Sequence, residues 1–84
     1  MKVSFTTQEF EDFIYWAERD RKTFRRLVKR IADVQRQPFS GIGKPESLKG
    51  DLSGYWSRRI NEADRLVHGV RAERIEIVQC RGHY

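Results

Sequence analysis

Two successive apolar stripes at helical spacing constrain the fold of this chain more than any other feature. The stripes are Phe10, Phe13, Ile14 and Ala17, followed by Phe24, Leu27, Val28 and Ile31. Each set recurs at the i, i+3, i+4 and i+7 spacing of one helix face. Thr6 and Glu9 form a capping-box pattern before the first stripe, and Asp20 is a predicted cap before the second. Two helices in a hairpin are therefore expected, with Trp16 adding to their buried side.

Short runs of β-branched and aromatic residues predict strands on both sides of this hairpin. The runs cover residues 3–6, 55–60, 65–70 and 74–80. Polar stretches of turn length separate the last three runs, as in antiparallel hairpins. The expected order is β-α-α-β-β-β, an α+β fold with a mostly antiparallel sheet covered on one face by the helix hairpin. The 84 residues are predicted to form a single domain, residues 1–84.

The segment from Pro38 to Gly54 is predicted to be a shaped loop. It holds both prolines and four of the six glycines, and the second helix must end before its first proline. Loops of this length in compact domains are usually functional or disordered. Lys44, Glu46 and Lys49 lie between these conformationally special residues, which favours a functional loop.

The composition favours a polyanionic partner and a reducing compartment. Seventeen Lys and Arg against twelve Asp and Glu give a net charge of +5, which suits nucleic acid or an acidic protein segment. Basic residues on the outer face of the second helix either follow a phosphate backbone or are simply solvated. The one cysteine, Cys80, is predicted to be buried and inert. No membrane span is visible, so the protein is expected in the cytoplasm.

The remaining candidates for chemistry are charged side chains, because no metal-binding or cofactor-binding motif is present. Antiparallel pairing is expected to bring Arg59, or its neighbour Arg58, together with Arg65 on the uncovered face of the sheet. Alternation along the last strand is expected to place Ile77, Gln79, Arg81 and His83 on one side.

Such a surface has the parts for cleaving RNA without a metal. A base takes the proton of the 2′-OH, a cation stabilises the charge on the phosphate, and an acid protonates the leaving 5′ oxygen. Glu46 is the candidate base, Arg65 the candidate stabiliser and His83 the candidate acid. Because the nucleophile is the 2′-OH, this route acts on RNA and not on DNA.

Several motifs in the same order resemble those of the YoeB (Txe) toxins of the RelE/ParE superfamily. They are Pro38-Phe39-Ser40-Gly41-Ile42-Gly43-Lys44-Pro45-Glu46, Leu48-Lys49, Leu52-Ser53-Gly54-Tyr55-Trp56-Ser57-Arg58-Arg59-Ile60, Arg65-Leu66-Val67 and His83-Tyr84. The resemblance covers the whole chain and implies a microbial-ribonuclease-like fold. It also implies a type II toxin that enters the ribosomal A site and cuts the mRNA codon there, leaving a 2′,3′-cyclic phosphate and a 5′-OH.

The resemblance assigns roles residue by residue. It implies Glu46 as general base, Arg65 as transition-state stabiliser, and His83 with Tyr84 as general acid and substrate-orienting pair. Lys49 and Arg59 match its phosphate-contacting positions, and Lys44, Arg58 and Arg81 are further candidates for binding RNA because of their charge. The chain departs from the family pattern at three positions: Ser47, Asp64 and Gly82. Asp64 adds a carboxylate that can pair with Arg65, and Gly82 gives the tail more backbone freedom.

The same resemblance implies partners. These are a YefM-type antitoxin with an acidic tail, the 70S ribosome with its A-site mRNA, and operator DNA reached only through the antitoxin complex; such toxins often form homodimers. No cofactor is implied. Two other functions stay open at this point. One is a non-catalytic toxin that binds the ribosome or gyrase, and the other is a binding module that serves only as antitoxin partner and co-repressor of its operon.

Overall fold

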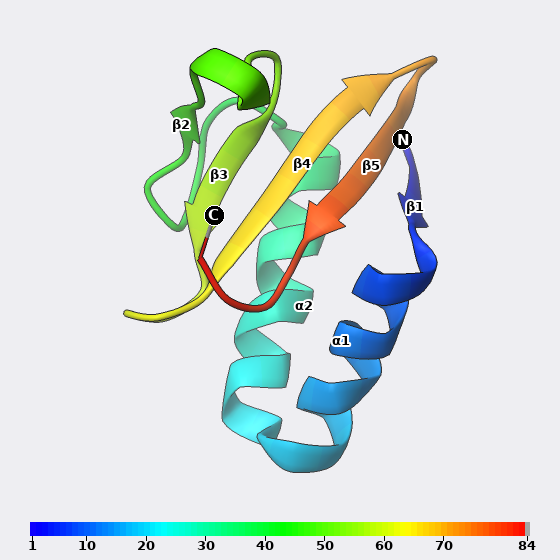
Figure 1. Cartoon of the computed structure of the whole chain (residues 1–84), viewed down its shortest axis with the longest axis vertical. Helices are drawn as coiled ribbons and strands as arrows, with labels where there is room; N and C mark the ends of the chain where they lie inside the picture. Colours follow the sequence, from blue (N-terminus) through cyan, green and yellow to red (C-terminus); the bar gives the residue numbers. More distant parts are fainter. Residues whose placement is uncertain (84) are drawn as a thin grey trace.

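One strand, two helices and four more strands follow one another along the chain (Figure 1). The structure, a computed structural model, describes residues 1–83. Its elements are β1 (Lys2–Phe5), α1 (Thr7–Arg19), α2 (Arg21–Arg36), β2 (Glu46–Ser47), the 3-10 helix η1 (Gly50–Leu52), β3 (Trp56–Arg59), β4 (Arg65–Arg71) and β5 (Arg74–Gln79). Both predicted helices and the predicted strands are confirmed. β2 and η1 lie within the segment that the sequence predicted as loop.

The strands form one sheet in the order β1-β5-β4-β3-β2. β1 runs parallel to β5, and the other neighbouring pairs are antiparallel. α2 lies behind the sheet, and α1 packs beside α2 towards the β1 edge (Figure 1). The predicted α+β class, with a mostly antiparallel sheet and a helix hairpin on one side, is therefore confirmed. Within the described residues no helix has the length and apolar character needed to cross a membrane.

The helix caps follow the sequence. The backbone amide of Glu9 donates to the Thr6 hydroxyl at 3.5 Å, and the amide of Thr23 donates to the Asp20 carboxylate at 3.0 Å. Asp20 also ends α1, since its own amide donates to the carbonyl of Trp16. One residue thus closes the first helix and opens the second, which fixes the tight hairpin.

The core lies between the helices and the sheet. It comprises Trp16, Leu27, Ile31, Val34, Ile60, Leu66, Ile75, Ile77 and Cys80. The predicted burial of Trp16 and Cys80 is confirmed, and burial raises the pKa of the Cys80 thiol to about 12. At this pKa the thiol stays protonated at neutral pH and is a poor nucleophile.

Part of each predicted apolar stripe remains exposed. Phe10, Ile14 and Val28 are 53%, 39% and 41% exposed, because α1 lies towards the β1 edge of the sheet and only part of each stripe reaches it (Figure 1). The nearby apolar hollow has a volume of about 320 Å³ and is lined by Val3, Phe5, Phe13, Val28, Ile31, Ala32 and Gln35. A patch of this kind is typical of a surface that binds another protein.

A bulge in β5 overturns one predicted alternation. Ile77 pairs with His68 whereas Gln79 pairs with Val67, so Val78 is an extra residue in the ladder. Because His68 and Val67 are consecutive in β4, Ile77 and Gln79 lie on opposite faces of the sheet. The prediction that both share one face with the tail was wrong, because a bulge leaves no mark in the apolar pattern.

Candidate active site

The uncovered face of the sheet carries a polar hollow at its β2 side. The register pairs Glu46 with Ser57, Ser57 with Val67, and Arg59 with Arg65. Residues that pair across strands share a face, so these side chains project together from the side opposite the helices. The hollow has a volume of about 290 Å³ and is lined by Lys44, Pro45, Glu46, Ser57, Arg59 and Arg65.

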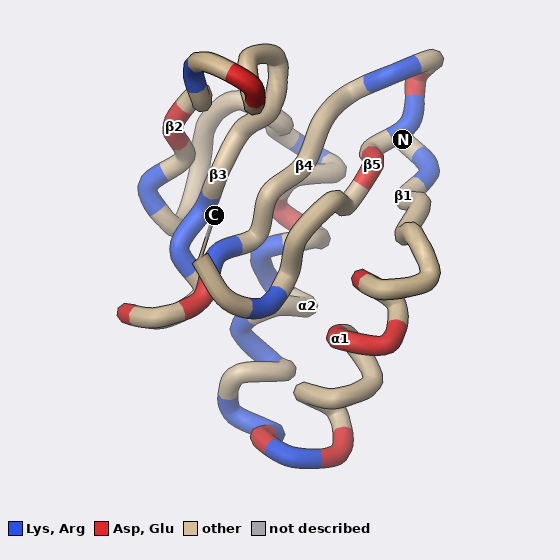
Figure 2. Tube along the Cα trace, viewed as in Figure 1, with Lys and Arg blue, Asp and Glu red and all other residues tan. Residues whose placement is uncertain are grey.

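The hollow is strongly basic, with one carboxylate at its edge. Three of its six lining residues are cations and one, Glu46, is an anion. Figure 2 shows these basic stretches where β3 ends and β4 begins, close to the C-terminal tail. Such a concave cationic surface suits a phosphate group, and the carboxylate beside it is placed to accept a proton.

The turn before β4 holds Arg65 in place. Its guanidinium donates to the carbonyl of Asn61 at 3.1 Å and to that of Asp64 at 3.5 Å. The Asn61 side chain in turn accepts the amides of Ala63 and Asp64, both at 2.8 Å. These local bonds shape the turn and so limit the movement of the Arg65 side chain at the edge of the hollow.

The C-terminal tail is tied to the start of β4. The carbonyl of Gly82 accepts the amide of Arg65 at 2.9 Å, and the amide of Gly82 donates to the Asp64 carboxylate at 2.7 Å. Gly82 has φ +84°, a conformation that side chains with a Cβ rarely adopt. The tail therefore turns past the start of β4 towards the end of β3 (Figure 1), and His83 is the residue that follows Gly82 in the chain.

Two expectations for the departures from the family pattern are settled by these bonds. The carboxylate of Asp64, expected to pair with the Arg65 side chain, accepts the Gly82 amide instead. Gly82 does not loosen the tail but forms the turn that ties it down. Tyr84, the other predicted tail residue of the site, lies outside the described residues.

A second set of contacts holds the tail against α1. The Trp16 indole donates to the carbonyl of Cys80 at 2.9 Å. The Arg81 guanidinium lies 3.6 Å from the centre of the Tyr15 ring and 3.6 Å from a carboxylate oxygen of Asp12. Arg81, predicted to contact RNA, thus lies on the α1 side of the tail and is not among the described residues that line the hollow.

The other predicted phosphate contacts divide into three groups. Lys44 and Arg59 line the polar hollow with Glu46 and Arg65, in agreement with the predicted grouping. Lys49 is exposed just before η1, outside the lining of the hollow. Arg58 is fully buried on the helix side of the sheet and donates to Asp33, so its prediction as a phosphate contact was wrong.

The sequence analysis missed Ser57, whose residue is 1% exposed and lines the polar hollow. Among the described residues its hydroxyl has no hydrogen-bond partner. A buried hydroxyl without a partner favours a ligand that bonds to it. The sequence did offer a way to find Ser57, because alternation along the strand puts it on the same face as Arg59.

Comparison with known proteins identifies the family of this chain. The family model for the YoeB-like toxin of bacterial type II toxin-antitoxin systems matches residues 5–84. Toxin YoeB of Streptomyces coelicolor is 54% identical over 84 residues, covering 100% of both chains. Toxin YoeB of Escherichia coli K12 is 44% identical, again over 100% of both chains.

Solved structures agree. The YoeB/ParE toxin from Agrobacterium tumefaciens superposes with a TM-score of 0.96, at 42% identity and over 100% of both chains. The toxin in a YoeB-YefM complex from Staphylococcus aureus superposes with a TM-score of 0.91, at 39% identity, over 100% of this chain and 98% of that one. With the family model and these full-length relatives in agreement, the chain belongs to the YoeB-like toxins of bacterial type II toxin-antitoxin systems.

Proposed function

We propose that this toxin is a ribosome-dependent endoribonuclease that cuts mRNA in the A-site codon. The observation that carries the proposal is the polar hollow, which is lined by Glu46, Arg59 and Arg65. We place His83 near its edge, because the preceding residue, Gly82, bonds to the amide of Arg65. A base, two cations and an imidazole are the parts that phosphodiester cleavage by the 2′-OH requires.

The steps assign one task to each side chain. The Glu46 carboxylate takes the proton of the 2′-OH, whose oxygen forms a bond to the adjacent phosphorus. Arg65 and Arg59 stabilise the negative charge that builds on the phosphate oxygens. The bond to the 5′ oxygen then breaks, and His83 donates the proton that this oxygen needs. The products are a 2′,3′-cyclic phosphate and a 5′-OH.

The chemistry assigns further contacts to the substrate. Lys44 lines the same hollow and would add positive charge near the phosphate. Lys49 would contact RNA beyond the hollow, from the exposed position before η1. Tyr84 is proposed to orient or stack the substrate. We also place the reaction in the cytoplasm, where translating ribosomes supply the substrate.

Partner binding follows from the family and from the surface. We infer that a YefM-type antitoxin binds this chain, that the complex reaches operator DNA, and that the toxin can dimerise. Solved structures from Staphylococcus aureus include a YoeB-YefM complex and a YoeB dimer. The exposed apolar residues around α1 and the net charge of +5 support a partner with both apolar and acidic segments.

Primer extension on an mRNA incubated with 70S ribosomes tests the proposed reaction. We expect a stop within the A-site codon that requires the toxin and the ribosome, and that is lost with His83→Gln or Glu46→Gln. A substrate with a 2′-deoxy nucleotide at the cleaved position should remain intact. If the native protein binds ribosomes but gives no stop, the toxin acts as a non-catalytic ribosome binder. If it inhibits supercoiling by gyrase instead, it is a non-catalytic gyrase-binding toxin.

A further inference from the structure

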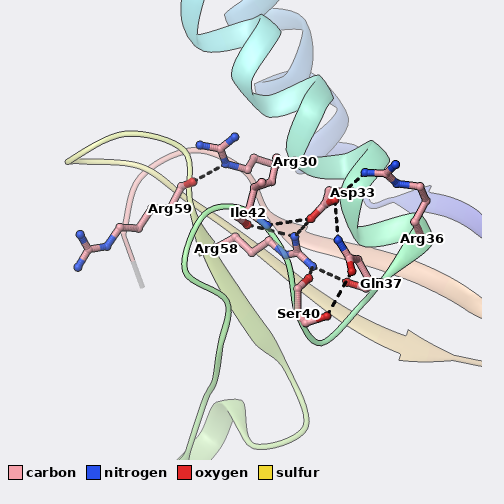
Figure 3. Close-up of polar contacts among 8 residues, drawn as sticks. All are labelled: Arg30, Asp33, Arg36, Gln37, Ser40, Ile42, Arg58 and Arg59. Carbon is pink, nitrogen blue, oxygen red and sulfur yellow. Dashed lines mark hydrogen bonds and ion pairs between the residues drawn. The ribbon is translucent and has the colours of Figure 1, made fainter.

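The fully buried Arg58 guanidinium is the centre of a polar cluster that the cleavage scheme does not use. Its two terminal nitrogens donate to the Asp33 carboxylate at 2.6 Å and to the carbonyls of Gln37, Ser40 and Ile42 at 2.6, 2.5 and 3.1 Å. Figure 3 shows these bonds converging on the guanidinium from the end of α2 and from the loop that follows it. We name these residues the Arg58–Asp33 cluster.

Asp33 completes the cluster from the helix side. Its carboxylate also accepts the backbone amide of Ile42 at 3.0 Å and the Gln37 side chain at 3.0 Å. These hydrogen bonds, with those from Arg58, hold the pKa of Asp33 far below its usual range. The carboxylate is therefore ionised wherever the protein is folded near neutral pH, and the loop of residues 37–45 is tied to a permanent pair of charges.

The loop has little else to hold it. Phe39 and Ile42 are 55% and 44% exposed, so the loop buries little apolar surface of its own. One apolar contact of the loop is between the rings of Phe39 and Trp56, whose centroids lie 5.2 Å apart. A single arginine that bonds three loop carbonyls in a planar fork can fix such a segment, whereas a lysine ammonium cannot reach the same set of acceptors.

The far end of this loop enters the polar hollow. Gly43, next to Ile42, accepts the amide of Arg59 through its carbonyl at 2.8 Å. Lys44 and Glu46 follow within a few residues and line the hollow. Arg58 and Arg59 are consecutive in β3, so alternation sends one guanidinium into the cluster and the next towards the hollow. The Arg58–Asp33 cluster and the polar hollow thus lie on opposite sides of β3.

We propose that Arg58 and Asp33 are positioning residues, which hold the loop of residues 37–45 so that Glu46 stands opposite Arg59 and Arg65. Their contribution to the reaction rests on the proposed function, whereas their hold on the loop does not. A buried pair of charges adds little stability over an apolar pair of the same size. Its role here is the geometry that it imposes on the loop.

The test compares Arg58→Lys with Arg36→Gln in the full-length chain. Arg36 also bonds Asp33, at 2.9 Å, but its side chain is 76% exposed, so the control removes a partner of Asp33 without removing the anchor. For Arg58→Lys we expect the Arg59 and Ile42 amides to exchange hydrogen at least about tenfold faster, with no change at the amides of β1 and β5. The control should leave all of these rates within about twofold.

Activity is measured by single-turnover cleavage on programmed ribosomes. A displacement of about 1 Å in a reacting group can cost about 100-fold in rate, so we expect Arg58→Lys to lose about 10- to 100-fold in cleavage rate while ribosome affinity stays within about twofold. If the lysine variant does not fold, Asp33→Asn replaces it, since the amide keeps the shape of the side chain and an acceptor for Ile42.

The outcomes separate the two proposals. Unchanged loop exchange and unchanged cleavage in a folded Arg58→Lys protein would overturn the positioning role. Faster loop exchange with an unchanged cleavage rate would overturn it as well, and would leave the proposed reaction standing. If the native protein cleaves nothing, the reaction fails, and the exchange rates still decide whether the cluster holds the loop.

Discussion

The loop of residues 37–45 leads directly to Glu46, the proposed base, and the tail of residues 80–83 ends at His83, the proposed acid, but the two segments are held by different forces. The loop is anchored by a fully buried ion pair and its hydrogen bonds. The tail is anchored by backbone bonds at Gly82, by the Trp16 indole, and by half-exposed contacts of Arg81. Breaking the buried ion pair should cost more than breaking the half-exposed contacts of Arg81. We therefore expect Glu46, the proposed base, to be more rigidly placed than His83, the proposed acid.

Removing one charge from each anchor gives the largest expected contrast. Asp33→Ala leaves the Arg58 charge buried without its carboxylate and should lower the free energy of unfolding by about 3–5 kcal/mol. Asp12→Ala removes the partner of Arg81, whose side chain is 43% exposed, and should cost less than about 1 kcal/mol. Denaturant unfolding measures both. Equal losses would end the distinction between a buried and a surface anchor.

Lowering the pH below neutral should lower the free energy of unfolding through protonation of His68. This residue is fully buried, and burial, with the nearby Arg58 charge, lowers the pKa of His68 to about 4 from 6.5. The unfolded chain then binds a proton at higher pH than the folded one, so stability is lost as pH falls from about 6.5 to about 4, by about 3 kcal/mol in all.

The matched variant for this titration is His68→Gln, followed by thermal or denaturant unfolding between pH 7 and pH 4. The variant should have a flatter profile than the native protein across this window. A native profile that is flat down to pH 4.5 would show that His68 titrates normally. Asp33 affects the profile only at pH values below the ordinary pKa range of an aspartate carboxyl, because its pKa in the folded protein is lowered.

Gly82→Ala tests the tail alone. At φ +84° a Cβ is strained, although the nearest atom lies 4.0 Å away, so the expected loss is about 1–2 kcal/mol and comes from the backbone, not from a clash. We expect slower cleavage, with hydrogen exchange of the Arg59 amide unchanged. Faster exchange at Arg59 would show that the tail and the loop are not independent.

Ser57→Ala should give the smallest change. The native hydroxyl is buried without a partner among the described residues, so its removal should leave stability the same or slightly higher. If the hydroxyl bonds the substrate, the cleavage rate should fall by about tenfold, the value of one hydrogen bond. An unchanged rate would remove Ser57 from the substrate contacts.

The sequence predicted what depends on local pattern and missed what depends on tertiary contact. Helical stripes, the Asp20 cap and the β3 to β5 hairpins follow from spacing and turn chemistry. β2 is two residues long, too short to show any period, and the bulge at Val78 leaves the composition of β5 unchanged. Both features decide which face a residue takes.

The candidate site shows the same division. Glu46, Arg59 and Arg65 line one hollow, as grouped from the sequence. The predicted strand pairing brought the two arginines together, whereas Glu46 was chosen by residue type, since β2 was missed. Arg58 was misassigned, because two adjacent arginines look alike in a sequence and only the helix on one side of the sheet distinguishes them. Its partner Asp33 gave no local signal, since a carboxylate near the end of a helix is ordinarily solvated.

The position of β5 also bears on when the protein can fold. β5 is the last strand along the chain but lies between β1 and β4, and Ser4 bonds to Ile75, 71 positions away. Contacts between such distant residues form late, because a long loop must close first. Until residues 74–83 have emerged during synthesis, the sheet lacks an inner strand and the proposed site lacks His83. The proposed site of the nascent toxin therefore stays incomplete while most of the chain is already made.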